Sequence, residues 1–128
     1  MILLNPARYT TDIDPASADL MKRTIAFFEA KGKAKLKDDD RDKVWYADFL
    51  AFLRDNQIFA KLLTPASHGP DDGADASYRW DTARNCDFNE ITGFYGLAYW
   101  YTWQVSILGL GPIWMSPNAE VKAKTAAH

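Results

Sequence analysis

The sequence predicts an all-α fold, an up-and-down bundle of about five helices formed by residues 1–128 as a single domain. Apolar residues recur at helical spacing in several separate segments. Signals that start or stop helices, such as Asp14-Pro15 and Gly32, flank these segments. In addition, residues 91–115 contain no Asp, Glu, Lys or Arg. These observations predict helices that pack around one apolar core.

The uncharged segment, residues 91–115, must be hidden from water, either in lipid or inside protein. A run of eighteen or more apolar residues is typical of a transmembrane helix. Here, however, polar residues such as Gln104 interrupt the run, glycines and Pro112 break it, and its Trp and Tyr residues lie centrally rather than at its ends. We therefore favour a helix buried on most of its circumference within an all-helical core.

The first helix has clear boundaries in the sequence. Residues 1–13 are expected to be extended, because Pro6 opposes an early helix. Asp14 then supplies an N-cap side chain, and the following proline occupies the first helical position, where its missing N–H costs nothing. Apolar residues recur at helical spacing up to Gly32, which is expected to stop the helix.

The next segment changes from lysine-rich to acidic. Residues 33–43 are predicted to be a polar connection whose aspartates cap the following helix. That second helix and a short apolar piece after it carry Trp45, Phe49, Phe52, Leu53, Ile58, Phe59, Leu62 and Leu63. Residues 64–77 contain two prolines and two glycines and are expected to form one long loop. In that loop, His68 has no second histidine or cysteine nearby and is interpreted as a solvated residue.

A third helix is predicted from near Ser77 to about Gly93. Four charged residues lie three apart along one side of it: Asp81, Arg84, Asp87 and Glu90. Opposite charges at this spacing pair on a helix surface, so an ion-paired face around the arginine is expected rather than a carboxylate site.

A fourth helix carries the aromatic residues of the uncharged segment, and residues 109–112 are expected to end it. Ser116-Pro117 should start a fifth helix, with Glu120 at a position like that of a capping box. This last helix has only about three turns before the sequence stops at His128. The domain therefore looks truncated at its C-terminal helix.

Composition and motifs exclude several classes of function. A net charge of −2 does not favour nucleic-acid binding, and Cys86 is the only cysteine, so no internal disulfide or cysteine metal cluster is expected. The opening residues lack the features of a secretory signal, which makes the cytoplasm the default location. The sequence has no nucleophile with an adjacent base, no metal-ligand spacing and no glycine-rich phosphate loop after a strand.

Three segments together resemble the acyl-CoA dehydrogenase family. Residues 108–124, LGLGPIWMSPNAEVKAK, are similar to the Leu-Gly-x-x-Pro-Ile turn that leads into a helix with Glu and Lys. Residues 62–75, LLTPASHGPDDGAD, are similar to the family's loop with proline and glycine between helices. Residues 80–93 match the next helix, where a glutamate such as Glu90 is usual. Their order and spacing agree, and the resemblance covers nearly the whole chain.

The resemblance implies that this chain is the N-terminal helical domain of an FAD-dependent flavoprotein of fatty acid β-oxidation and lipid metabolism. Such an oxidoreductase carries out α,β-dehydrogenation of a fatty acyl-CoA and passes electrons to an electron-transfer flavoprotein. The catalytic base and most FAD contacts would lie beyond residue 128. The chain alone is therefore expected to be inactive and to hold no FAD or metal, whereas the complete enzyme is expected to be a homo-oligomer.

Carried over through the Leu-Gly-x-x-Pro-Ile turn, the residues facing the acyl chain would be Trp100, Gln104 and Leu108, which also share one helix face. The tryptophan departs from the family pattern, in which smaller side chains are common there, and Ser116-Pro117 stands where a glycine often lies. From periodicity alone, the same face is also explained as packed core. A stand-alone helical interaction module and a membrane-associated helical protein remain as alternatives.

Overall fold

The computed structural model describes residues 4–127, with the side chain of Asp72 excepted. This part of the chain is all-helical and contains no strand, which confirms the predicted fold class. The elements in chain order are η1 (Pro6–Tyr9), α1 (Pro15–Lys31), α2 (Lys33–Arg41), α3 (Ala47–Asp55), α4 (Ile58–Leu63), η2 (Ala66–His68), α5 (Pro70–Gly73), α6 (Thr82–Tyr95), α7 (Leu97–Met115) and α8 (Ala119–Ala126).

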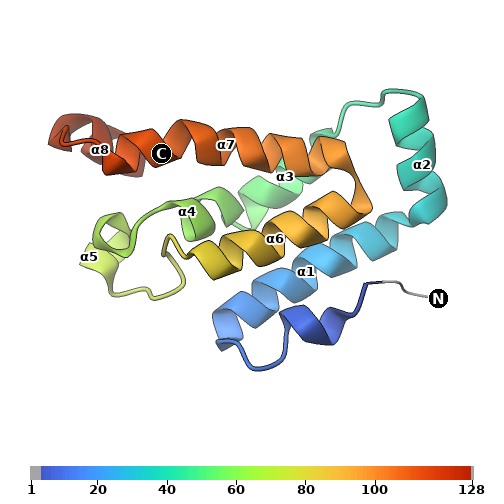
Figure 1. Cartoon of the computed structure of the whole chain (residues 1–128), viewed down its shortest axis with the longest axis horizontal. Coiled ribbons are helices and arrows are strands. Elements are labelled where there is room, and N and C mark those ends of the chain that lie inside the picture. Colours follow the sequence, from blue (N-terminus) through green and yellow to red (C-terminus); the bar gives the residue numbers. More distant parts are fainter. Residues whose placement is uncertain (1–3, 128) are drawn as a thin grey trace.

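The long helices alternate in direction, as an up-and-down bundle requires (Figure 1). Helices α1 and α6 run the same way, whereas α3 with α4, and then α7, run in the opposite direction. Helix α2 stands at one end of the bundle and α8 at the other. Within residues 4–127, no helix combines the length and apolar character needed to cross a membrane.

The core is built from interlocking aromatic side chains. Phe28 of α1 stacks on Tyr95 of α6, with ring centroids 4.7 Å apart, and meets Tyr99 of α7 edge-on at 5.0 Å. Farther along α7, the Trp103 ring lies 4.5 Å from that of Phe88. Such ring pairs add to the stabilisation that comes from burying apolar area. Helix α1, far away in sequence, is thereby held against the consecutive helices α6 and α7.

Helix α1 has the boundaries that the sequence predicts. The Asp14 carboxylate accepts hydrogen bonds from the Ser17 backbone N–H at 3.0 Å and from the Ser17 hydroxyl at 2.7 Å. At the other end, Gly32 has a φ of +78° and donates its N–H to the Phe28 carbonyl at 3.0 Å. Glycine adopts this backbone conformation without steric cost, so the chain can turn sharply after α1.

Three segments predicted to lack a helix are helical in part, and one of them, residues 64–77, contains η2 and α5 rather than a loop alone. Residues 6–9 form η1, capped by Asn5, so the prediction of an extended start is wrong there; residues 1–3 lie outside the described part of the chain. Residues 33–41 form α2 rather than a polar connection, and its aspartates do not cap α3. The physical reason is that Lys35 and Asp39 pair across one helical turn in a segment rich in good helix formers.

Helix α6 begins later than predicted and lacks the predicted ion-paired face. Asp81 caps the helix by accepting hydrogen bonds from the N–H groups of residues 83 and 84. Arg84 points inward, is buried and donates to the Ser77 carbonyl at 3.1 Å. Glu90 pairs instead with Arg8, at 2.9 Å. The charged residues of α6 therefore have other roles. Asp81 caps the first turn of the helix, and Glu90 holds the helix against the N-terminal segment.

Helix α7 continues through the residues that were expected to end it. Pro112 lies inside the helix on its exposed side, where its ring does not disturb the core. The helix ends at Met115, and α8 begins at Ala119 with Asn118 as its N-cap rather than at Ser116. A proline inside a helix removes one backbone hydrogen bond. On the other side of the helix, Leu110 packs against the core.

Candidate functional site

The side of α7 that faces away from the bundle is apolar and exposed. The buried residues of this helix are Tyr99 and Trp103. Large exposed apolar side chains recur at helical spacing on the other side, and we call them the outer stripe: Leu97, Tyr101, Val105, Leu108 and Met115. The exposed fraction is 74% for the first and 88% for the last. The prediction of a helix buried on most of its circumference is therefore wrong.

The reason is the position of α7 at one edge of the bundle (Figure 1). On its inner side, the Tyr99 ring lies 5.0 Å from that of Phe49 in α3, and the Trp103 ring stacks on Phe59 of α4 at 5.2 Å. No element within residues 4–127 covers the outer side. Contiguous exposed apolar surfaces of this kind are typical of sites that bind another protein surface or an apolar ligand.

The three residues predicted to face an acyl chain lie along one flank of α7, which runs from beside its buried side into the outer stripe at Leu108. Trp100 is half-buried, and its ring lies against Gly93 of α6, where an added Cβ would be 3.7 Å from the ring. Gln104 is also half-buried, and Leu108 is 62% exposed. Successive residues of a helix are rotated by about 100°, so residues four apart are offset by roughly 40°. The three residues therefore follow this flank along the helix. Their contact with an acyl chain stays a prediction.

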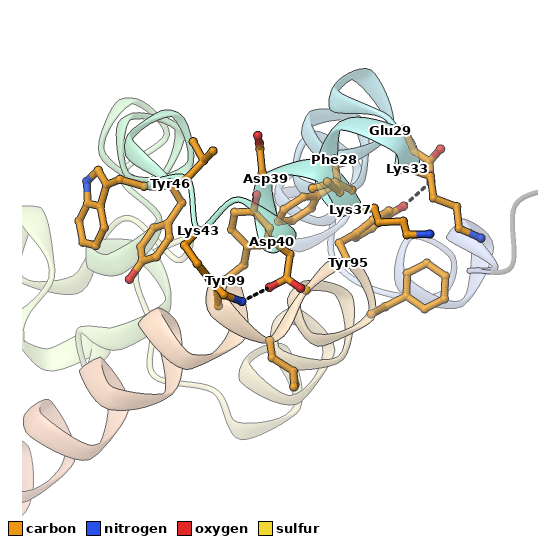
Figure 2. Close-up of a pocket in the computed structure, with 17 residues that line it drawn as sticks. Phe28, Glu29, Lys33, Lys37, Asp39, Asp40, Lys43, Tyr46, Tyr95 and Tyr99 are labelled. Carbon is orange, nitrogen blue, oxygen red and sulfur yellow. Dashed lines mark hydrogen bonds and ion pairs between the residues drawn. The ribbon is translucent and has the colours of Figure 1, made fainter.

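A second feature is an open groove of about 840 Å³ between α2 and the corner where α6 meets α7 (Figure 2). We call it the α2 groove. Its floor is aromatic and consists of Phe28, Tyr95 and Tyr99, and the segment of residues 43–46 lines one end. The volume lies in the range of small-molecule sites, which is about 300–1,000 Å³. None of the three residues predicted to face an acyl chain lines this groove.

Ionic contacts attach α2 to the bundle beside the groove. Lys31 of α1 pairs with Asp39 at 3.0 Å and with Asp48 of α3 at 2.7 Å, and Lys35 binds the same Asp39. Burial acts to lower the pKa of Lys31, but its hydrogen bonds to the two carboxylates outweigh burial and hold the pKa above its usual range. The hydrogen bonds from Lys35 and Lys31 likewise lower the pKa of Asp39. Lys31 and Asp39 are therefore charged at neutral pH.

A hydrogen bond between α1 and α6 closes another part of the groove wall. The Tyr95 hydroxyl donates to the Glu29 carboxylate at 2.5 Å (Figure 2). Burial, followed by this hydrogen bond to a carboxylate, raises the pKa of Tyr95 above its ordinary value. The tyrosine is therefore a neutral donor at physiological pH, and Glu29 is engaged within the protein.

The remaining reactive side chains do not gather into a site in the part of the chain that the structure describes. Cys86 is exposed, and no group of three His, Cys, Asp or Glu residues within residues 4–127 has the geometry of a metal site. His68 is half-buried rather than fully solvated, because its ring packs 5.4 Å from that of Trp114. The Ser67 hydroxyl lies 3.0 Å from its Nδ1 atom.

Sequence reasoning missed the α2 groove because it treated residues 33–43 as a connection. Without α2, the groove has no second wall. The signal that was present is the spacing of four between Lys35 and Asp39, together with helix formers throughout residues 33–37. That signal predicts a helix, although it does not predict where the helix packs.

Comparison of the chain with protein-family models, with curated proteins and with solved structures finds no match. The class of protein that the fold and surface define is thus an all-helical domain with one apolar helix face uncovered and one aromatic groove.

Proposed function

We propose that this chain is the helical domain of an acyl-CoA dehydrogenase-like flavoenzyme, in which α7 forms one wall of the acyl-chain pocket. The observation that carries the proposal is the outer stripe of α7, an apolar surface that another domain would have to cover. The resemblance of residues 62–124 to that family and the all-helical fold support it. Burial of this surface against flavin-binding domains would then leave an apolar channel along the flank of α7.

In this arrangement, the chain supplies binding rather than chemistry. Trp100 and Leu108 would contact the methylene groups of the acyl chain and exclude water from them. Gln104 is the uncharged polar group on this flank, so it would limit how far an apolar chain can extend. The proposed reaction is α,β-dehydrogenation of the acyl-CoA, with an electron-transfer flavoprotein as electron acceptor.

The flank and the outer stripe of α7 do not by themselves fit FAD. Its diphosphate requires charged or backbone donors, whereas α7 carries no charged side chain and its outer stripe is apolar. The proposal therefore assigns FAD and the catalytic base to the domains that would cover α7, in the same or in a separate polypeptide. No catalytic residue is assigned to this chain.

Two experiments test the proposal. The first isolates the endogenously tagged protein from its source under native conditions and records its visible absorbance. Flavin absorbance that bleaches on addition of fatty acyl-CoA, and returns with an electron-transfer flavoprotein, is expected; a native assembly without flavin would refute the proposal. The second mixes the 128-residue chain with FAD and acyl-CoA. Bleaching in that mixture would contradict the assignment of the chemistry to other domains.

The same uncovered face also favours a second candidate, a stand-alone helical module that binds a protein partner. Monomeric soluble proteins rarely expose contiguous apolar patches larger than a few hundred Å². The two candidates differ in what covers α7. A native assembly that buries the outer stripe but contains neither flavin nor acyl-CoA activity would favour the interaction module.

A further inference from the structure

The α2 groove carries charged groups whose pairing can be traced one by one. Glu29 accepts the Tyr95 hydroxyl, and Asp39 is bound by two lysines. Asp40 lies 3.8 Å from Lys43, in a pair exposed to solvent. Asp39 and Asp40 are thus paired with lysines, whereas Glu29 has a hydrogen bond from a neutral hydroxyl rather than an ion pair.

Two lysines of the groove have no such engagement. Lys33 and Lys37 lie one helical turn apart on α2, line the groove and have no carboxylate within 4.0 Å among the described residues. Figure 2 shows both side chains on the part of the groove wall that lies beside Tyr95 and Glu29. Their combined charge is positive, and it stands beside an aromatic surface with low polarity.

The apolar surface of the groove is large and partly open. Phe94 and Trp45 both line the groove and are 46% and 65% exposed. The Trp45 ring stacks on Tyr46 at 4.4 Å, which holds it at the rim although solvent reaches it. Exposed aromatic rings around a buried aromatic floor present flat surfaces on which an apolar ligand can stack.

We propose that the α2 groove binds a small amphipathic anion, an aryl or alkyl carboxylate, sulfonate or phosphate ester, with its apolar body on the aromatic floor and its charged group between Lys33 and Lys37. The volume of about 840 Å³ accommodates a ligand of two or three fused or linked rings. The proposal does not rest on the acyl-CoA dehydrogenase-like function, because the groove does not include Trp100, Gln104 or Leu108.

The test uses a matched pair of probes that differ in charge. Anilinonaphthalene sulfonate carries one negative charge, and N-phenylnaphthylamine has the same rings without the sulfonate. Titration followed by fluorescence should show that the wild-type chain binds the anion about five- to tenfold more tightly, as expected for ionic contacts near a protein surface. Added salt should reduce this preference, because it screens the lysines. Equal affinity for the two probes would overturn the proposal.

Variants then locate the charge and the apolar contact. The double variant Lys33→Gln/Lys37→Gln should lose the preference for the anion while retaining affinity for the neutral probe. Lys22→Gln is the matched control, because Lys22 is exposed on α1 and does not line the groove. Phe94→Ala should weaken both probes by a similar factor, and circular dichroism verifies that each variant remains folded. An unchanged preference in the double variant would refute the assignment of the lysines.

Binding to the outer stripe must be separated from binding to the groove. In a spectrum of the indole N–H groups, the anionic probe should shift the resonance of Trp45, assigned by its loss in Trp45→Phe. Trp80 lies beside Gly111 near the other end of α7 and should be unaffected. A shift at Trp80 without one at Trp45 would place the probe elsewhere and contradict the proposal.

Discussion

Helices α1 and α7 are of similar length, but different features determine where each helix begins and ends and which side it buries. Helix α1 has a side-chain cap from Asp14, a glycine stop, and polar residues on the side that faces water. Helix α7 has no side-chain cap at its start, no charged residue, and apolar side chains on both its buried and its exposed sides. The comparison shows that local signals can define one helix completely, whereas another depends on what it packs against.

The largest expected effect is on the free energy of unfolding, and it distinguishes the buried side of α7 from its exposed side. Trp103→Ala removes a fully buried side chain from between Phe59 and Phe88, so it should lower the free energy of unfolding by about 3–5 kcal/mol. The matched control is Tyr101→Ala on the outer stripe, which is 61% exposed and should change stability by no more than about 0.5 kcal/mol. Denaturant unfolding measures both. Similar losses for the two variants would break the distinction between the sides.

The next effect concerns the local signals of α1. Asp14→Ala removes the cap that the Ser17 N–H and hydroxyl use, and it also removes the 2.6 Å contact with Arg79. Loss of an N-cap typically costs about 0.5–2 kcal/mol. The same unfolding assay should therefore show a loss smaller than that of Trp103→Ala. A loss as large as that of the core variant would show that α1 depends on more than its local signals.

The Asp14 carboxylate also makes the stability of the fold depend on pH. Burial acts to raise the pKa of Asp14, but hydrogen bonds from Ser17 and the contact with Arg79 outweigh it and lower the pKa below its usual range. Since the folded pKa is below the unfolded value of about 3.9, this contribution is present at neutral pH and is lost as pH falls below about 4. Between about pH 5 and pH 2, Asp14→Asn should lose stability less steeply than the wild type. Parallel pH curves would argue against this role.

The last expected effect concerns substrate preference and lies on the flank of α7. Trp100→Ala and Gln104→Leu should leave flavin content unchanged in the complete enzyme that we propose but alter the preference between short and long acyl-CoA substrates. The reason is that both side chains are half-buried on the flank that would line the acyl pocket. Steady-state rates with a series from butyryl-CoA to palmitoyl-CoA measure the preference. If the relative rates across this series are unchanged in both variants, the flank does not line the pocket.

The sequence allowed correct predictions where a helix has one polar face and marked ends. The limits of α1 are of this kind. Predictions failed where a residue's partner lies outside its own helix. Glu90, expected to pair with a residue on its own helix, binds Arg8, and Arg84, expected at the surface, is buried against residue 77. Helical spacing identifies neighbours within a helix but not the partner that another element supplies.

The candidate sites show the same division. The shared flank of Trp100, Gln104 and Leu108 follows from spacing alone, and the structure places them together on α7. The α2 groove depends on the sharp turn at Gly32 and on the contacts of Lys31 with Asp39 and with α3, which no local pattern predicts. The groove therefore became visible only when the helices were placed in space.

The pattern of residues was enough to predict an all-helical fold, the limits of α1 and the uncharged apolar segment at residues 91–115. Which side of α7 is covered, and that α2 forms one wall of a groove, depended on how the helices pack in space. The physical reason is that a helical pattern identifies a buried face only by contrast with a polar one. Because α7 is apolar around most of its circumference, packing against α3, α4 and α6 selected its buried side and left the outer stripe exposed.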